Sequence, residues 1–442
     1  MSLHDVNGQM VDTPDENPHY IRAVTAVGDA QQLVAEQDIY ASNGMKLIAK
    51  GAPINSHQFE RLTKHKLSLP LDQLVVASNP VDGTALALDM DKVLEDDARY
   101  RQIAARTGDP RALKQSLGNL RLQGPILLRL TVLRERFPDI YRHSVRTAMI
   151  AYAIGQRLSL PARDIDHLLL AALCHDMGEM HTDPALLASE HSITPSERRY
   201  VHVHPVTAFV LLRELPGITP AAAQAVLHHH ERLDGSGYPG DLPGARIARL
   251  ARIIGVADVA EAVMKRFDMA RLDMLFRLNR ARFDADIVGA LRDLVSMKHM
   301  DGSGTPEIDD TAAQLNRLAG LLQAWFAVRD TLEAPASGCA HATFLFERMG
   351  AIRSMVLQAG FNPDNMASML AVAKEDPAIM RELSGMLDEM DWLMQDLANE
   401  IDRRSPELAG LSQGALKGLL GQLRPAEDVL PHDASVARQT AC

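Results

Sequence analysis

Histidines and acidic residues are concentrated in one part of this sequence. Ten of the seventeen histidines lie between Asp139 and Asp258, and several of them stand beside a carboxylate. Imidazole nitrogens and carboxylate oxygens together are ligands that suit borderline divalent metals such as iron, manganese and zinc. Five or more imidazoles with two or three carboxylates are too many for one ion, so the region predicts a site for two or three metal ions.

Two pairs of candidate ligands stand early in this region. Asp139 and His143 are four residues apart on an expected helix, so their side chains share one face. His175 and Asp176 directly follow the apolar helix expected at 168–174, which places them at the end of a buried element. Alone, each pair could be an ordinary surface pair or a helix cap.

Four further candidates follow along the chain. We expect His204 in a helix that begins near 195–197, and His229 and His230 on another helix, about 100° apart around its axis. Neighbours placed in this way can serve different ions of one cluster. Asp258 follows an apolar run. A solvated helix end would explain the histidine run by itself, but the coincidence of all these patterns in one region favours a metal site.

The composition is that of a soluble globular protein with two or three domains in 442 residues. Aromatic residues make up only 4% of the chain, while Leu, Ala and Met abound, which favours helices. The net charge of −11 argues against binding to a nucleic-acid polymer. It does not exclude a small anionic substrate, because a metal cluster sets its own local field.

Several observations predict a cytoplasmic protein. The apolar runs of the histidine-rich region are too short to cross a bilayer, so we expect no membrane span. The polar and acidic N-terminus lacks the pattern of a secretory signal. The three cysteines have no motif spacing, which is consistent with a reducing compartment. Cys174 stands beside the candidate ligands, but within an apolar helix we expect it to be a small core residue.

The N-terminal part of the chain predicts a small α+β unit. Strands expected at 37–40 and 46–49 flank Asn43-Gly44, which is a strong hairpin signal. Asn55 is expected to cap a short helix, and 74–76 is expected to return as a strand.

Beyond residue 86 the apolar spacing is helical almost to the end. We expect helices over 86–107 and 112–136, the second interrupted at Gly124-Pro125. The expected breaks in a last helical block, 309–423, are Gly338, Gly360-Phe361-Asn362-Pro363 and Asp376-Pro377. A stripe of Met386, Met390 and Met394 is expected to be helix core, with a partner-binding groove as the alternative.

The order of the motifs resembles the HD-GYP family, a branch of the HD-domain metal phosphohydrolases. The matching residues are His143-Ser144, His175-Asp176-Met177-Gly178, His204-Pro205, His229-His230-Glu231-Arg232-Leu233-Asp234-Gly235-Ser236-Gly237-Tyr238-Pro239 and Arg252-Ile253-Ile254-Gly255-Val256-Ala257-Asp258. The match covers about residues 137–265, a little under a third of the chain.

The resemblance implies hydrolysis of cyclic di-GMP, a bacterial second messenger, to pGpG or GMP at two or three iron or manganese ions. The metal ligands that it implies are His143, His175, Asp176, His204, His229, His230 and Asp258. Within this set, His175 and Asp176 are the catalytic pair and Asp176 bridges two ions. Asp139 stands where some family members carry a Glu that brings in a third metal.

The chemistry fits the residue types. A phosphodiester is anionic and resists attack, and two close metal ions can neutralise its charge and supply a bridging hydroxide near neutral pH. The candidate substrate-binding residues are Glu179, Arg232, Gly237, Tyr238, Pro239, Lys265 and Arg266. Tyr238 could stack on a base or pack within the protein, and the glycines beside it allow a backbone to approach a ligand closely.

The sequence departs from the family pattern at three places. Glu179 replaces the lysine that follows the His-Asp motif and holds a substrate phosphate. Phe267 and Ala270 stand at two positions that are usually basic, although Lys265 and Arg266 could take their place. Ala208 replaces the glycine of the His-Pro motif. The metal ligands are therefore complete, while the phosphate-binding residues are altered.

These observations predict a mainly α fold, with a helical HD-type metal domain, a small N-terminal α+β unit and a C-terminal helical extension. The expected segments are a flexible leader (1–20), the α+β unit (21–84), a helical connector (85–136), the metal domain (137–305), a C-terminal helical domain (306–423) and a disordered tail (424–442). The C-terminal helices could form a homodimer or bind a protein partner.

Two functions remain open from the sequence. The first is an active cyclic di-GMP phosphodiesterase. The alternative is a protein of the same family with weak or no hydrolysis, acting as a nucleotide sensor or scaffold, or a phosphohydrolase of another cyclic dinucleotide. The charge of Glu179 favours the alternative, because an anion beside a diphosphate is unfavourable by about one to a few kcal/mol.

Overall fold

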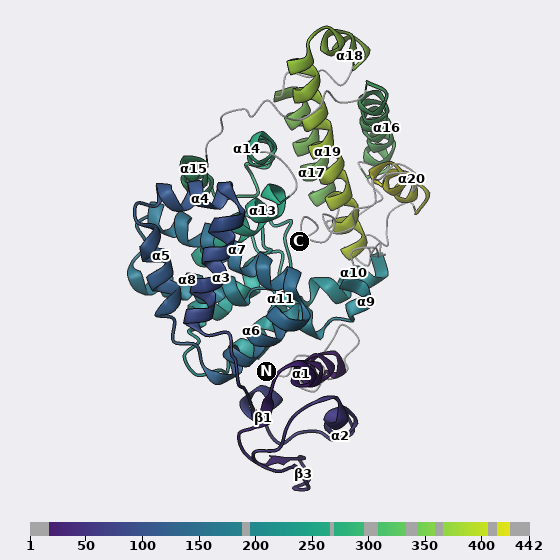
Figure 1. Cartoon of the computed structure of the whole chain (residues 1–442). Helices are drawn as coiled ribbons and strands as arrows, with labels where there is room; N and C mark the ends of the chain where they lie inside the picture. Colours follow the sequence, from purple (N-terminus) through teal and green to yellow (C-terminus); the bar gives the residue numbers. More distant parts are fainter. Residues whose placement is uncertain are drawn as a thin grey trace. The chain divides into compact units, whose positions relative to one another are not determined.

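The computed structural model describes residues 17–187, 195–265, 269–295, 308–332, 343–358, 366–404 and 413–424. Over these ranges the chain is mainly helical, and its short strands lie near the N-terminus (Figure 1). The predicted fold class is therefore confirmed. The described residues divide into two compact units, the first formed by 17–265 with 281–295 and the second by 269–280 with the described residues from 308 to 424.

The first unit begins with the small α+β part. Its elements are α1 (Pro18–Ala30), β1 (Leu33–Ala35), β2 (Ile39–Tyr40), β3 (Lys46–Ile48), η2 (Ser56–Gln58), α2 (Phe59–Thr63), η3 (Leu71–Gln73) and β4 (Val75–Ala77). β1 pairs antiparallel with β4, and β2 pairs antiparallel with β3. Each pair is a separate two-stranded sheet, and α1 packs against the short helices η2 and α2.

The local signals of this part were predicted correctly. Gly44 takes a φ of +85° in the turn between β2 and β3, a conformation that favours glycine. The Asn55 side chain accepts a hydrogen bond from the amide of His57 and so caps η2. Helix α1 was not predicted, and its first three residues fall in the segment expected to be a flexible leader.

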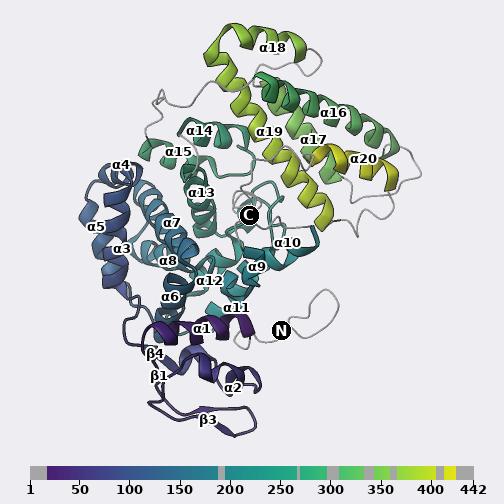
Figure 2. The ribbon, with the colours of Figure 1, turned by 45° about the vertical axis from the view of Figure 1, so that its right-hand side comes forward.

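The rest of the first unit is helical. Its elements are α3 (Gly83–Asp96), α4 (Ala98–Arg106), α5 (Pro110–Gly118), α6 (Gly124–Arg136), α7 (Pro138–Arg157), α8 (Ala162–Cys174), η4 (Met177–His181), α9 (Pro184–Leu187), α10 (Pro195–His202), α11 (His204–Leu212), α12 (Pro220–His228), η5 (Gly244–Arg246), α13 (Arg249–Met264) and α15 (Ala285–Leu294). Helix α7 packs against both α8 and α13 at the centre of this group (Figure 2).

Two helix boundaries differ from the prediction. The helix expected over 86–107 is divided at Asp97, whose side chain accepts from the amide of Arg99 and caps α4. The helix expected to contain His204 also ends earlier, at His202, and a new helix begins at His204. Pro205 explains this break, because proline lacks the amide that a continuous helix needs and fits the first turn of a new one. The predicted interruption at Gly124-Pro125 is confirmed, since α6 begins there.

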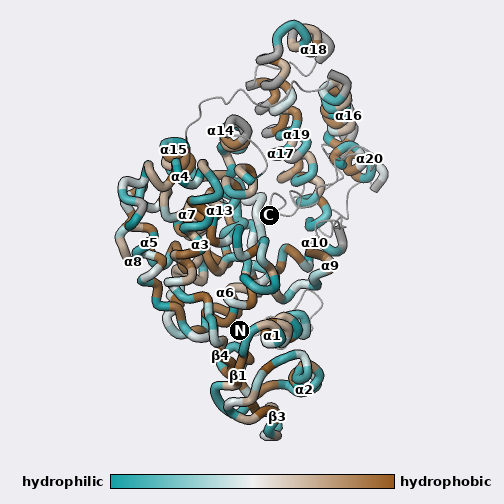
Figure 3. Tube along the Cα trace, viewed as in Figure 1, coloured by the Kyte–Doolittle hydropathy of each residue, from teal (hydrophilic) through white to brown (hydrophobic). Residues whose placement is uncertain are grey.

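The second unit is a group of helices with its own apolar core. Its elements are α14 (Met269–Leu278), α16 (Ile308–Leu332), α17 (Thr343–Gln358), α18 (Met366–Glu375), α19 (Pro377–Arg403) and α20 (Gln413–Leu423). Apolar and hydrophilic residues alternate along α19, as expected of an amphipathic helix (Figure 3). The helix break expected at Asp376-Pro377 is confirmed, whereas those at Gly338 and 360–363 lie outside the described residues.

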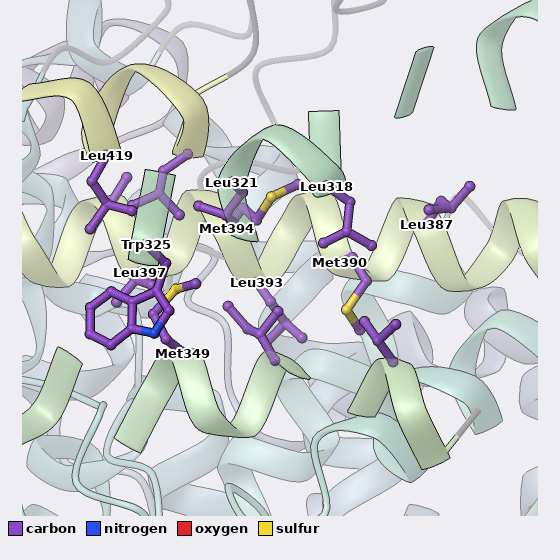
Figure 4. Close-up of a cluster of buried hydrophobic side chains, with 14 of the residues drawn as sticks. Leu318, Leu321, Trp325, Met349, Leu387, Met390, Leu393, Met394, Leu397 and Leu419 are labelled. Carbon is purple, nitrogen blue, oxygen red and sulfur yellow. The ribbon is translucent and has the colours of Figure 1, made fainter. Parts of the chain in front are cut away.

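The methionine stripe lies inside this core. Met386, Met390 and Met394 are at most 2% exposed, and Figure 4 shows Met390 and Met394 among leucines and Trp325. The prediction of helix core is confirmed for these residues, as it is for Cys174, which is 1% exposed. Among the described helices, none combines the length and apolar character that a bilayer crossing requires.

Two glycines within helices give a matched test of packing. A Cβ at Gly28 in α1 would lie 1.7 Å from the carbonyl oxygen of Ile54, whereas a Cβ at Gly289 in α15 would meet nothing within 4 Å. We expect Gly289→Ala to raise the free energy of unfolding by about 0.5–1 kcal/mol through helix propensity. We expect Gly28→Ala to lower it in spite of the same propensity gain. Denaturant unfolding of both variants checks this, and equal effects would contradict the close approach of α1 to Ile54.

Candidate metal centre

Five helices bring the candidate ligands together. His143 lies within α7 and Asp258 within α13, which pack against each other. The other ligands stand where helices end or begin: His175 and Asp176 after α8, His204 at the start of α11, and His229 and His230 after α12. All seven are at most 7% exposed. The expectation that His229 and His230 lie on a helix is wrong, because α12 ends at His228 and both residues follow it.

Three of the histidines are oriented by the same local arrangement. The ring nitrogen Nδ1 of each faces the backbone carbonyl three residues earlier in the preceding helix. The distances are 2.8 Å from His175 to Ala172, 2.8 Å from His204 to Val201 and 2.6 Å from His229 to Val226. These carbonyls belong to the last turns of α8, α10 and α12, where no further helical amide reaches them. Because a carbonyl only accepts, Nδ1 carries the proton and Nε2 presents a lone pair.

His143 is oriented by a side chain instead. Its Nδ1 lies 2.7 Å from Oε2 of Glu261, a carboxylate that is 1% exposed. Oε1 of Glu261 lies 3.6 Å from the guanidinium of Arg146, one turn along α7 from His143. The sequence reasoning missed Glu261. Its position three residues after Asp258 on α13 was the available signal, because residues at this spacing share a helix face.

The ligand atoms form two groups. In the first, Nε2 of His143 lies 3.0 Å from Oδ1 of Asp258 and 3.3 Å from Nε2 of His175. In the second, Nε2 of His204 lies 3.4 Å from that of His229 and 3.1 Å from that of His230. Within each group the ligand atoms all lie within 4.8 Å of one another.

Asp176 faces both groups with different oxygens. Its Oδ2 lies 3.0 Å from Nε2 of His175 and 3.5 Å from Nε2 of His143. Its Oδ1 lies 3.3 Å from Nε2 of His204 and 3.7 Å from Nε2 of His229. One oxygen of Asp176 would therefore be available to an ion at each group.

The residues fit bound cations. Most of the converging atoms are acceptors that face other acceptors, because Nδ1 of His143, His175, His204 and His229 points away from the centre. A proton on Nε2 of His143 accounts for its contact with Asp258. The other converging lone pairs still face one another unless a cation lies between them. Donor atoms about 2.0–2.2 Å from one ion lie about 3 Å from each other, which matches the spacing within each group. The ends of α8, α10 and α12 add partial negative charge, which favours cations.

Burial and charge set the protonation of the ligands. Burial lowers the pKa of His229 to about 4, and burial together with the neighbouring His229 lowers that of His230 well below its usual value. Burial raises the pKa of Asp176, but His175 and the other nearby histidines outweigh it and hold that pKa well below its usual range. These groups are therefore in the forms that metal ligands require at neutral pH.

Burial lowers the pKa of His204, but its hydrogen bond to the Asp176 carboxylate outweighs burial and raises that pKa. The pKa of His143 is shifted in the same direction. Burial lowers its pKa, but the carboxylates of Glu261 and Asp258 outweigh burial and raise it well above the usual value. A metal ion at the first group must therefore displace a proton from His143, so we expect binding there to weaken as the pH falls.

Glu179 lies beside this cluster. Its amide donates to the carbonyl of Asp176 at 3.0 Å within η4, and residues three apart in such a helix lie on the same side. Burial and the Asp176 carboxylate raise the pKa of Glu179 to about 7, while the charges of His204, His143 and His175 act in the opposite direction. The Glu179 carboxyl group therefore interacts electrostatically with residues of both ligand groups.

The loop that carries the Gly-Tyr-Pro run is held by the protein itself. Glu231, 5% exposed, accepts from the amides of Gly240 at 2.6 Å and Leu242 at 2.8 Å. A Cβ at Gly237 would lie 2.4 Å from the carbonyl oxygen of His230. Glycine is therefore required here for an approach to the chain's own backbone, and the loop is drawn against the ligand His230.

The other predicted substrate residues have varied surroundings. The Tyr238 ring is 4% exposed and stacks on His202 with centroids 4.1 Å apart, which is the packing alternative of the two foreseen. Arg232 is 3% exposed, and its Nη1 donates to the carbonyls of His229 and Glu231. Pro239 is exposed and follows Tyr238 through a cis peptide bond.

Two of the predicted site residues that the structure describes are not brought into the cluster. Asp139 is 79% exposed and pairs with Arg142 at 2.6 Å, so its side chain belongs to neither ligand group. Lys265 is exposed at the end of α13. Arg266 lies outside the described residues, as does Phe267, one of the two positions where a basic residue was expected.

Comparison with known proteins agrees with this geometry. Residues 130–287 match the model of a family described as HD domain. This segment of the chain is an HD domain. The chain is 34% identical over 137 residues to a cyclic di-GMP phosphodiesterase of Pseudomonas aeruginosa, covering 31% of this chain and 33% of that protein. The resemblance predicted from the motifs is confirmed for this domain.

Two further similarities concern a relative with another substrate and a solved structure. A 3'3'-cGAMP-specific phosphodiesterase of Vibrio cholerae is 31% identical over 150 residues, 34% of this chain and 35% of that protein. The chain thus spans about a third of the length of these curated relatives. A solved HDG"Y"P protein of Bdellovibrio bacteriovorus aligns with 62% of this chain and 97% of its own, at 16% identity and a TM-score of 0.34.

Glu261 gives a test of how His143 is oriented. We expect Glu261→Ala to lower the affinity of one of the metal ions about 10–100-fold, because the Nδ1 proton of His143 loses its acceptor. Glu261→Gln keeps an acceptor oxygen and should cause a smaller loss. Metal content and affinity, measured by titration of the metal-free protein, check this order. Equal affinities in all three proteins would show that His143 does not need Glu261.

Proposed function

We propose that this chain is a metal-dependent phosphodiesterase that hydrolyses cyclic di-GMP to pGpG or GMP. The observation that carries the proposal is Asp176, whose two carboxylate oxygens face two separate groups of imidazoles. A single structural metal ion would need only one such group. Two ion positions joined by a carboxylate are the arrangement that suits hydrolysis of a phosphodiester.

The chain's residues would divide the work as follows. His143, His175 and Asp258 would hold one ion, and His204, His229 and His230 the other, with Asp176 shared. When bound, the ions neutralise the charge of the phosphodiester and lower the pKa of water, so that hydroxide is available near neutral pH. Glu261 keeps the Nε2 lone pair of His143 directed at the site. Met177 and Met180 are fully buried in η4, the short helix that follows Asp176.

The donor set supports iron or manganese as the metal. The two groups consist of imidazole and carboxylate alone, which are ligands that suit iron and manganese as well as zinc. Cys174 directly precedes His175, but burial raises the pKa of its thiol to about 12, so it offers no thiolate at neutral pH.

The substrate class rests on the relatives of the HD domain. One relative is named for cyclic di-GMP and another for 3'3'-cGAMP, at 34% and 31% identity. Both names share a cyclic dinucleotide, and cyclic di-GMP is the first choice because the motif order matches that family. 3'3'-cGAMP is the second candidate, and the same assay compares the two.

Glu179 favours a further candidate, a sensor or scaffold that binds the nucleotide with weak turnover. Its carboxyl group lies where the family carries a lysine, close to the Asp176 carboxylate whose charge acts on it. A negative charge at this place opposes an incoming phosphate. This candidate keeps the metal ions and loses only hydrolysis.

The first test measures hydrolysis and metal content on the same anaerobically purified protein. We expect at least two iron or manganese ions per chain and release of pGpG or GMP. Replacing both His175 and Asp176 with alanine should remove product formation and most of the metal. The matched control is a neighbouring pair on α8, the exposed Asp166 and the half-buried His167, and replacing both with alanine should change neither product formation nor metal content. Full metal loading without any product would overturn the enzyme proposal and leave the sensor.

The second test addresses Glu179. If the carboxylate weakens phosphate binding, Glu179→Lys should lower KM for cyclic di-GMP about tenfold or more, which corresponds to about 1.4 kcal/mol. Glu179→Gln removes the negative charge without adding a cation, so its KM for cyclic di-GMP should lie between those of the wild type and Glu179→Lys. A loss of activity in both variants would instead assign Glu179 a working part in the site. Calorimetric binding of the nucleotide to the same proteins separates affinity from turnover.

A further inference from the structure

A second buried polar cluster lies in the first unit, outside the two ligand groups. It consists of Tyr20, Asp72, Arg129 and His181, which we call the Arg129 junction. These residues are 0%, 2%, 1% and 8% exposed, respectively. An arginine and an aspartate are rarely this deeply buried unless they are paired, and their position requires an explanation.

The four side chains form one connected network. Nε and Nη2 of Arg129 both lie 2.5 Å from Oδ2 of Asp72. The guanidinium carbon of Arg129 lies 4.8 Å from the centre of the Tyr20 ring, and its Nη1 lies 3.4 Å from Nε2 of His181. The rings of Tyr20 and His181 stack with centroids 5.0 Å apart. A charged, directional network of this kind fixes orientation as well as distance.

The junction joins three parts of the first unit. Tyr20 lies in α1 and Asp72 in η3, so both come from the α+β part. Arg129 comes from α6, in the helical connector. His181 is the last residue of η4, which follows Asp176 directly. A second contact reinforces the link, because Asn17 donates its side-chain amide to the carbonyl of His181 at 2.8 Å.

The segment held at His181 has little freedom to shift. η4 begins directly after Asp176, the residue that faces both ligand groups, and it contains Glu179. A Cβ at Gly178 would lie 2.1 Å from the carbonyl oxygen of the ligand His204, so η4 and the start of α11 are in close contact. A displacement of His181 would therefore also shift Asp176, which precedes η4, and His204, whose carbonyl η4 contacts.

Stability alone does not explain the charges. A buried ion pair can often be replaced by apolar residues of similar volume with no loss of stability. The directional network is thus a costly way to fill a core, while it is a suitable way to fix the position of η4. We propose that the Arg129 junction is the link through which the N-terminal α+β part positions Asp176 and thereby sets the metal affinity of the HD domain. Its effect on hydrolysis rests on the proposed function, whereas its effect on metal binding does not.

The experiment separates positioning from folding. In the full-length chain, Asp72→Leu with Arg129→Met replaces the ion pair by apolar residues, and we expect an unfolding temperature close to that of the wild type. We expect its affinity for iron or manganese to fall at least about tenfold, as when the supporting partners of metal ligands are removed. The control is the same exchange in the exposed pair of α7 and α15, Asp293→Leu with Arg157→Met, which are 2.7 Å apart and should leave metal affinity unchanged.

A second variant keeps the test valid if the double variant does not fold. His181→Ala leaves the Asp72–Arg129 pair intact and removes only the side chain that joins it to η4. We expect this variant to fold and to lose metal affinity as well. Wild-type metal affinity in a folded double variant, or in His181→Ala, would show that the junction is only part of the core. Because the readout is metal affinity, an inactive wild type would refute the enzyme proposal without affecting this one.

Discussion

The metal centre depends on one constraint, which is that several buried acceptor atoms point at the same place. The Nδ1 atoms of His143, His175, His204 and His229 each face a carbonyl or carboxylate acceptor, so their Nε2 atoms are directed at the site. The proton that His143 retains has to be displaced by a cation there. Such a convergence is unfavourable in an apolar interior unless cations occupy it. The packing of α7, α8, α11, α12 and α13 is what holds these acceptors together.

Much of this arrangement could be predicted from the sequence, because it follows from local signals. The ligand types, their order along the chain and the apolar elements before them are visible as residues. The seven residues shared with the HD-GYP pattern do form two buried groups that could hold metal ions. The hairpin at Gly44 and the cap at Asn55 were also predicted, since turn and cap residues act within a few positions of the chain.

The remaining features depend on contacts between distant segments. Asp139 has the right spacing from His143, but it stands in the first turn of α7 and is exposed, which no spacing rule could reveal. Glu261 is separated from His143 by 118 residues, and Arg129 from Asp72 by 57, so the sequence does not show that either pair is in contact. The sequence left two roles for Tyr238, stacking on a base or packing within the protein. It does not show that His202 covers one face of the Tyr238 ring.

The helix ends at the metal centre have a consequence for its dynamics. His175, His204 and His229 each replace a missing amide at the end of a helix, so one hydrogen bond both finishes a helix and aims a ligand. Fraying of that last turn and release of the ligand are therefore the same local event. Ions that hold the imidazoles in place will suppress fraying of α8, α10 and α12 together, which couples three separate helix ends thermodynamically. His143 lies in the middle of α7 and takes no part in this coupling.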